Sequence, residues 1–271
     1  MSGRAMTDRI LETADEAGSR AALVDASDGS VTAWPRFART VRAAACGLAR
    51  RGLAEGDTAG VLVQDAASAA VAVNAIRAAG GAACLIEAGA SPADIATRLN
   101  ACGARLLITS APLAELAAEG ADRSRVRQVI AFGEAPGTTP FSSLLSFPDE
   151  CAADESGRPK EGNGLADQHV LAPEGDEGPV PAPPAGGTGT GPGGARQLTH
   201  RDVVIAAPPC GDGQAYTSLL DLTLLTGATL VAAPVTLVAA ATRVYHGTAA
   251  IVPHGTDVPG VLPGLVLPVT S

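Results

Sequence analysis

Short apolar runs alternate with helix-like segments along the first half of the chain, and this alternation is what most constrains the fold. The runs with strand character are 21–25, 58–64, 82–86, 105–109 and 126–132. The segments between them have helical spacing, and they include 34–53, 66–79, 91–102 and 112–119. Such alternation is typical of helices packed on both faces of a mainly parallel sheet. The predicted fold class is therefore α/β.

The segment 34–53 shows the helical pattern most clearly. Phe37, Val41, Ala44 and Leu48 recur at intervals of three and four residues, which places them on one face of a helix. Pro35 stands where a first helical turn tolerates proline, and Gly52 marks the end. We expect this helix to bury its apolar face against the sheet.

A change of composition divides the chain. The pattern of elements dissolves into Gly, Pro, Asp and Glu after residue 146, and the sequence PVPAPP at 179–184 favours an extended linker. We therefore predict an N-terminal α/β subdomain at 1–146, a linker at 147–187 and an incomplete second α/β subdomain at 188–271. Beyond Pro253, further prolines exclude a long regular element and predict an irregular or partly ordered end.

Charge and composition exclude several function classes. The net charge is −9, and the chain lacks the basic patch with stacking aromatic residues that a nucleic-acid surface needs. The four histidines are far apart, so no metal site is predicted. No apolar run reaches the roughly twenty residues of a membrane span. The five cysteines form no Cys-x-x-Cys pair, which favours a reducing cytoplasm.

A glycine- and threonine-rich loop carries the strongest chemical signal. Residues 186–200 read GGTGTGPGGARQLTH, and small residues of this kind can present backbone N–H groups to a phosphate. The predicted nucleotide contacts are Thr188, Gly189, Thr190, Gly191 and Arg196. No catalytic residue is predicted. Two alternatives stay open: a dinucleotide fingerprint, which would need a preceding strand, and a glycine linker without a ligand.

The loop and three earlier segments resemble the AMP-forming acyl-CoA synthetases, the adenylating ligases that include 4-coumarate and fatty acid CoA ligases. The earlier segments are AALVD at 21–25, GLARRGLAEGD at 47–57 and NACGARLLIT at 100–109. The resemblance implies ATP-dependent adenylation of a carboxylic acid and thioester formation with CoA, with ATP or AMP bound weakly.

This chain departs from the family pattern at two places. Gly193, Gly194 and Ala195 stand where the family has Pro-Lys-Gly, and the only lysine of the chain is Lys160. The aromatic–histidine pair of the family's acyl pocket corresponds to Gly211 and Asp212. We expect a truncated and catalytically inactive relative.

The alternative expectation is a non-enzymatic assembly partner. An unfinished second subdomain would leave the strands at 230–233 and 249–252 uncovered, which invites association. This reasoning predicts a homodimer, or a complex with a full-length synthetase, through residues 216–252.

Overall fold

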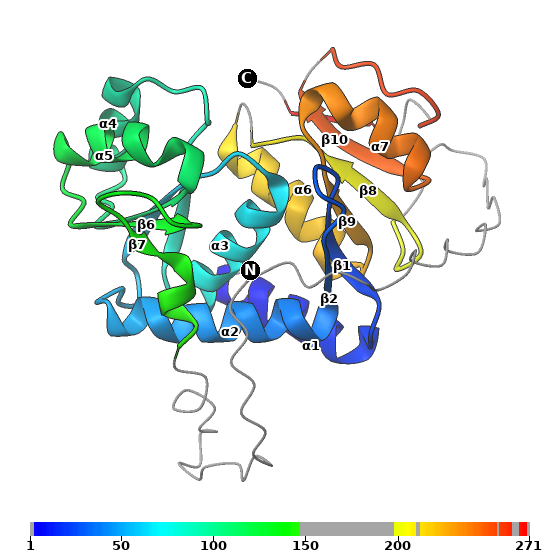
Figure 1. Cartoon of the computed structure of the whole chain (residues 1–271). Coiled ribbons are helices and arrows are strands. Elements are labelled where there is room, and N and C mark those ends of the chain that lie inside the picture. The colour runs from blue at the N-terminus through cyan, green and yellow to red at the C-terminus, as the bar shows by residue number, and fades with distance from the viewer. Residues whose placement is uncertain (1–2, 147–197, 210–211, 254, 262–265, 270–271) are drawn as a thin grey trace, which may run out of the picture.

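The computed structural model describes residues 3–146, 198–209, 212–253, 255–261 and 266–269 (Figure 1). The predicted linker at 147–187 lies outside these residues, and the division of the chain at residues 146 and 188 stays a prediction. Within the described part, helices and strands alternate as the sequence indicates, and the strands form two sheets.

The first sheet, which we call the N-terminal sheet, is entirely parallel and has the order β4-β3-β5-β6-β7. Its strands are β3 (Thr58–Leu62), β4 (Ala82–Leu85), β5 (Leu106–Ser110), β6 (Gln128–Phe132) and β7 (Thr139–Pro140). Helices α4 (Pro92–Ala101) and α5 (Ala114–Asp122) cover its outer face, where Ile95, Leu99 and Ala117 pack on Leu62 and Leu107. Short 3-10 turns follow β5 (Ala111–Leu113) and β7 (Phe141–Leu144).

The second sheet, which we call the mixed sheet, joins the two ends of the described chain in the order β11-β10-β8-β9-β1-β2. Its strands are β1 (Ala21–Asp25), β2 (Val31–Ala33), β8 (Val203–Ala206), β9 (Thr229–Ala232), β10 (Ala249–Pro253) and β11 (Val266–Val269). Only the β1–β2 pair among them is antiparallel. Strands from before residue 146 and after residue 188 thus share one sheet.

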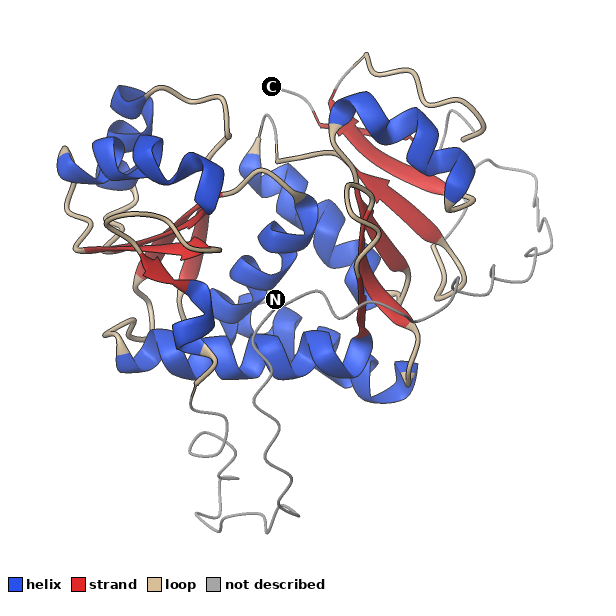
Figure 2. Cartoon of the chain, viewed as in Figure 1, coloured by secondary structure: helices blue, strands red, loops and turns tan. Residues whose placement is uncertain are grey.

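A layer of four helices packs against both sheets (Figures 1 and 2). It consists of α1 (Gly3–Ala17), α2 (Trp34–Arg50), α3 (Ala66–Ala78) and α6 (Gly213–Leu225). One apolar cluster runs from Val61 of the N-terminal sheet through Phe37 and Leu220 of this layer to Leu230 of the mixed sheet. Helix α7 (Val238–Val244), preceded by a 3-10 turn (Val235–Leu237), covers the far face of the mixed sheet. The α/β fold with helices on both faces is confirmed.

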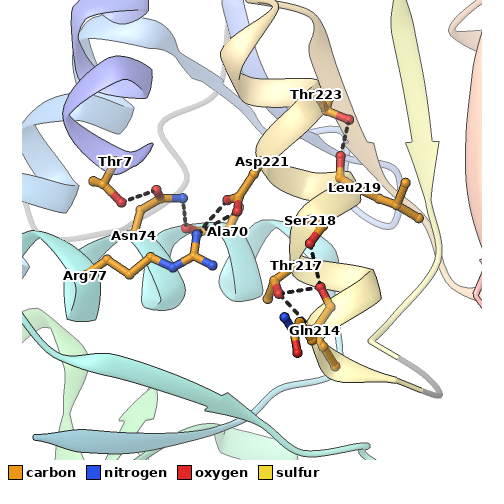
Figure 3. A network of polar contacts seen from close by, with 11 residues as sticks. Thr7, Ala70, Asn74, Arg77, Gln214, Thr217, Ser218, Leu219, Asp221 and Thr223 are labelled. Carbon is orange, nitrogen blue, oxygen red and sulfur yellow. Dashed lines mark hydrogen bonds and ion pairs between the residues drawn. The ribbon is translucent and has the colours of Figure 1, made fainter. Parts of the chain in front are cut away.

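A buried polar network fastens the helices of the central layer to one another (Figure 3). The Arg77 guanidinium on α3 donates to both carboxylate oxygens of Asp221 on α6, at 2.7 and 2.8 Å. Thr7 on α1 donates to Asn74 on α3 at 2.8 Å. Burial raises the pKa of Asp221, and this effect outweighs the lowering by Arg77. The charge of Arg77 therefore offsets only part of the cost of burying the ionised Asp221 carboxylate.

One expectation from the sequence is wrong. The strands expected to be uncovered lie inside the mixed sheet: β9 pairs with β8 and β1, and β10 pairs with β8 and β11. Leu230, Val231, Ile251 and Val252 are each 0% exposed. The tail, predicted to be irregular or partly ordered, contains the short edge strand β11, which accommodates Pro268 because an edge position leaves one side of the strand unpaired.

Candidate functional site

A cavity of about 480 Å³ opens where the two sheets approach each other. Every residue of its wall ends a strand or follows one, and both sheets contribute. In open α/β sheets, ligands bind in the crevice outside the carboxyl ends of the strands. We call it the inter-sheet cavity, and it is lined by Asp25, Ser27, Gln64, Asp65, Ala88, Pro208, Ala232, Ala233 and Pro234.

Asp65 holds its place at the cavity because it caps a helix. It precedes α3, and its Oδ1 accepts the Ser68 backbone N–H at 2.6 Å. Burial raises the pKa of Asp65, hydrogen bonds from Ser68 oppose this, and the nearby charge of Asp25 raises it further. The charge of Asp25 thus lies near enough to disfavour the ionised form of Asp65.

Asp25 ends β1 and is fixed by the turn that follows. Its Oδ1 accepts the Ser27 N–H at 2.7 Å, while its backbone N–H donates to the Ser30 carbonyl at 2.9 Å. The next residue, Ala26, donates its N–H to the Ala232 carbonyl of β9 at 2.8 Å. Turn and sheet together hold the carboxylate against the cavity.

The predicted phosphate contacts Thr188, Gly189, Thr190, Gly191 and Arg196 lie outside the described residues, so they stay predictions. The structure does describe the LTHRD segment at 198–202 that follows them. Asp202 Oδ2 accepts from the Thr199 N–H at 2.7 Å and from the Thr199 hydroxyl at 2.9 Å. Arg20 donates to the His200 carbonyl at 2.9 Å. These contacts anchor the start of β8, at the end of the strand opposite to Pro208.

Asp212, which stands where the resembled family has its histidine, has a structural role. It precedes α6, and its Oδ1 accepts the Gln214 N–H at 2.9 Å, which is an N-cap contact. Gly211, its neighbour, lies outside the described residues. The cavity nevertheless reaches this region through Pro208.

Sequence reasoning missed Asp25, Gln64 and Asp65 as site residues. A signal was present, because Asp25 ends one predicted strand, and Gln64 and Asp65 stand at the end of another. The sequence did not reveal that β1 belongs to the mixed sheet and β3 to the N-terminal sheet, and that the ends of both face one cavity.

Searches of the described residues give two negative findings. They contain no group of three or more His, Cys, Asp or Glu side chains placed to hold a metal ion. They also contain no helix of the length and apolar character that crossing a bilayer requires.

Comparisons with known proteins point to one family. The model of the family described as AMP-binding enzyme matches residues 10–254. A long-chain-fatty-acid-CoA ligase from Archaeoglobus fulgidus is similar with a TM-score of 0.65 and 16% identity, over 93% of this chain and 51% of that one. A benzoate CoA ligase from Burkholderia xenovorans LB400 gives 0.62 and 14%, over 92% and 50%.

The N-terminal domain of FACL13 from Mycobacterium tuberculosis gives a TM-score of 0.64 and 17% identity, over 94% of this chain and 68% of that one. No curated protein sequence matches the chain. The chain thus spans about half the length of the two ligase chains from Archaeoglobus fulgidus and Burkholderia xenovorans. At these identities, the similarity to the solved structures shows the fold.

Proposed function

The chain belongs to the AMP-binding enzyme family, and from this membership we propose that it binds ATP or AMP and derives from enzymes that adenylate a carboxylic acid. In that reaction, a carboxylate oxygen attacks the α-phosphorus of ATP and pyrophosphate leaves. The thiol of CoA then attacks the acyl carbon and releases AMP. The observation that carries the proposal is the family match, which extends over 10–254 and includes the glycine- and threonine-rich loop.

The proposed phosphate contacts are the backbone and hydroxyl groups of Thr188, Gly189, Thr190 and Gly191, with Arg196 as the nearby cation. Successive backbone N–H groups favour an anion, and an arginine adds charge-assisted hydrogen bonds. This supports a site for the phosphates of the nucleotide.

We further propose that turnover is lost. Adenylation needs the charge that develops on the transferring phosphoryl group to be stabilised. The loop holds glycine and alanine where the resembled family has its lysine, and Lys160, the only lysine, precedes the loop. Asp212 at the histidine position caps α6. Both departures remove groups that the family uses.

The assembly role loses its main argument. It rested on uncovered strands, and β9 and β10 are paired on both sides and buried. No other observation on the described residues favours a homodimer or a complex with a full-length synthetase.

The test of lost turnover is carboxylate-dependent exchange of labelled pyrophosphate into ATP, with a panel of aliphatic and aromatic acids. We expect no exchange above the protein-free background. A clear signal that depends on the protein would refute the loss of turnover.

The test of the site's location is a double variant, Thr190→Ala with Arg196→Ala, titrated with AMP in a calorimeter. We expect the binding heat to disappear. The matched control is Thr97→Ala with Arg105→Ala, two exposed positions around α4 and β5. Unchanged binding in the first double variant would place the nucleotide elsewhere.

A further inference from the structure

We propose that the inter-sheet cavity binds a ligand through its primary ammonium group, held between Asp25 and Asp65. This inference goes beyond the proposed function and does not rest on it. Binding itself is a property of the cavity, and it can be measured without a nucleotide.

The first argument is the position and size of the cavity. Its volume of about 480 Å³ falls within the range of small-molecule sites. Its wall joins the end of β1 and β9 in one sheet to the end of β3 in the other. A ligand here would therefore contact both sheets at once.

The second argument is charge. Among the residues that the structure describes, the cavity lining contains two carboxylates and no lysine, arginine or histidine. Among the ion pairs formed by the described residues, none involves Asp25 or Asp65. Burial of a carboxylate is costly when no opposite charge compensates it, and a nearby carboxylate adds to the cost. A ligand cation would supply the missing charge.

The third argument is hydrogen-bonding capacity. A carboxylate offers about four acceptor sites. The turn at Ser27 fixes the carboxylate of Asp25, and the cap at Ser68 fixes that of Asp65. Asp65 also accepts hydrogen bonds from the Ser68 side chain and the Ala67 backbone N–H. Each carboxylate still keeps at least one acceptor site for a ligand. An ammonium group carries three donors, so it can donate to both carboxylates.

The remaining lining residues indicate which kind of ligand fits the cavity. Ala88, Pro208, Ala233 and Pro234 form apolar walls, which suit a hydrocarbon or aromatic body. A bare metal ion would leave these walls unused, and the described residues offer no third His, Cys, Asp or Glu side chain in such a group. A phosphate or carboxylate would be repelled by the two aspartates. An apolar amine fits the lining best.

The experiment compares three probes by calorimetry at pH 7: tryptamine, its neutral counterpart tryptophol, and tryptophan, which adds a carboxylate to the amine. We expect tryptamine to bind about tenfold more tightly than tryptophol, because hydrogen bonds to charged groups are the stronger ones. Tryptophan should bind more weakly than tryptamine, which separates simple amines from amino acids as the source. Magnesium chloride is the inorganic control, and Mg²⁺ should not compete with tryptamine for the cavity.

The variants are Asp25→Asn and Asp65→Asn, singly and together. Asparagine can replace aspartate in the Ser27 turn and in the α3 cap, so each variant should keep the fold. The double variant should lose the preference of tryptamine over tryptophol. The matched control is Asp28→Asn, an exposed residue of the same loop that accepts from the Ser30 N–H at 2.8 Å and does not line the cavity.

Equal binding of tryptamine and tryptophol by the parent protein would overturn the proposal, as would a preference that survives in the double variant. Magnesium binding that displaces tryptamine would overturn it too. Thermal unfolding of each variant shows whether it is folded. Loss of AMP binding in the loop variants, with tryptamine binding intact, would separate the two sites.

Discussion

The ion pair between Arg77 and Asp221 offers the sharpest test of how the central layer is held together. Arg77 contacts both oxygens of Asp221 at 2.7 and 2.8 Å, and the two side chains are only 16% and 8% exposed. The Arg77→Ala variant would leave a buried carboxylate without its partner. Breaking a buried pair in this way costs about 3 to 5 kcal/mol.

The assay is urea unfolding, followed by circular dichroism at pH 7. The exposed pair of Arg9 and Glu12, with side chains 67% and 65% exposed and 3.5 Å apart, provides the control. Arg9→Ala should cost about 0 to 1 kcal/mol. The double replacement Arg77→Met with Asp221→Leu should recover most of the loss, since apolar residues of similar volume need no desolvated charge.

The pH dependence follows from the sign of the shift. The pKa of Asp221 is raised in the folded protein, so its protonation stabilises the fold. This stabilisation is fully present below the ordinary pKa of 3.8 and is lost as the pH rises through the folded pKa. Without Arg77, the pKa rises further. The loss in Arg77→Ala should therefore shrink at acid pH. A cost below about 1 kcal/mol at pH 7 would refute the claim that this pair secures α3 to α6.

Three further perturbations test local features. Gly47→Ala should destabilise the protein by about 1 to 3 kcal/mol, because a Cβ would lie 2.5 Å from the Leu144 carbonyl oxygen, whereas Gly89→Ala meets no atom within 4 Å; urea midpoints compare the two. Asp65→Asn should leave stability at pH 7 unchanged or higher and should lose that advantage below about pH 4, because the raised pKa of Asp65 makes its charged form unfavourable. Asp212→Ala should cost about 1 kcal/mol in thermal unfolding through loss of the α6 cap, and an unchanged Tm would show that the cap contributes nothing.

Much of the architecture could be predicted from local pattern. The strands at β1, β3, β4, β5, β6 and β9 and the helices between them follow the sequence periodicity closely. Helix α2 ends at Arg50, three residues before the predicted limit, because Gly52 has a positive φ of 91° that terminates the helix. Local patterns suffice here because each element buries its own apolar face.

The arrangement of strands could not be predicted in the same way. Leu23 pairs with Leu230, and no local signal in either segment specifies that partner. The error about uncovered strands has this origin, since β1 supplies the neighbour that β9 was expected to lack. The acidic pair was missed for a similar reason, because Asp25 and Asp65 line the same cavity only as a result of the packing of the two sheets.

Calorimetric titration of AMP into the parent protein tests the central claim most directly. A loop with one nearby arginine and no lysine should hold the nucleotide with a Kd of roughly 100 µM to 1 mM. Saturable binding in this range, at a stoichiometry of about one and weakened by added salt, is the predicted result. Absence of any saturable heat at millimolar AMP would contradict the claim that this chain has kept the nucleotide site of its family.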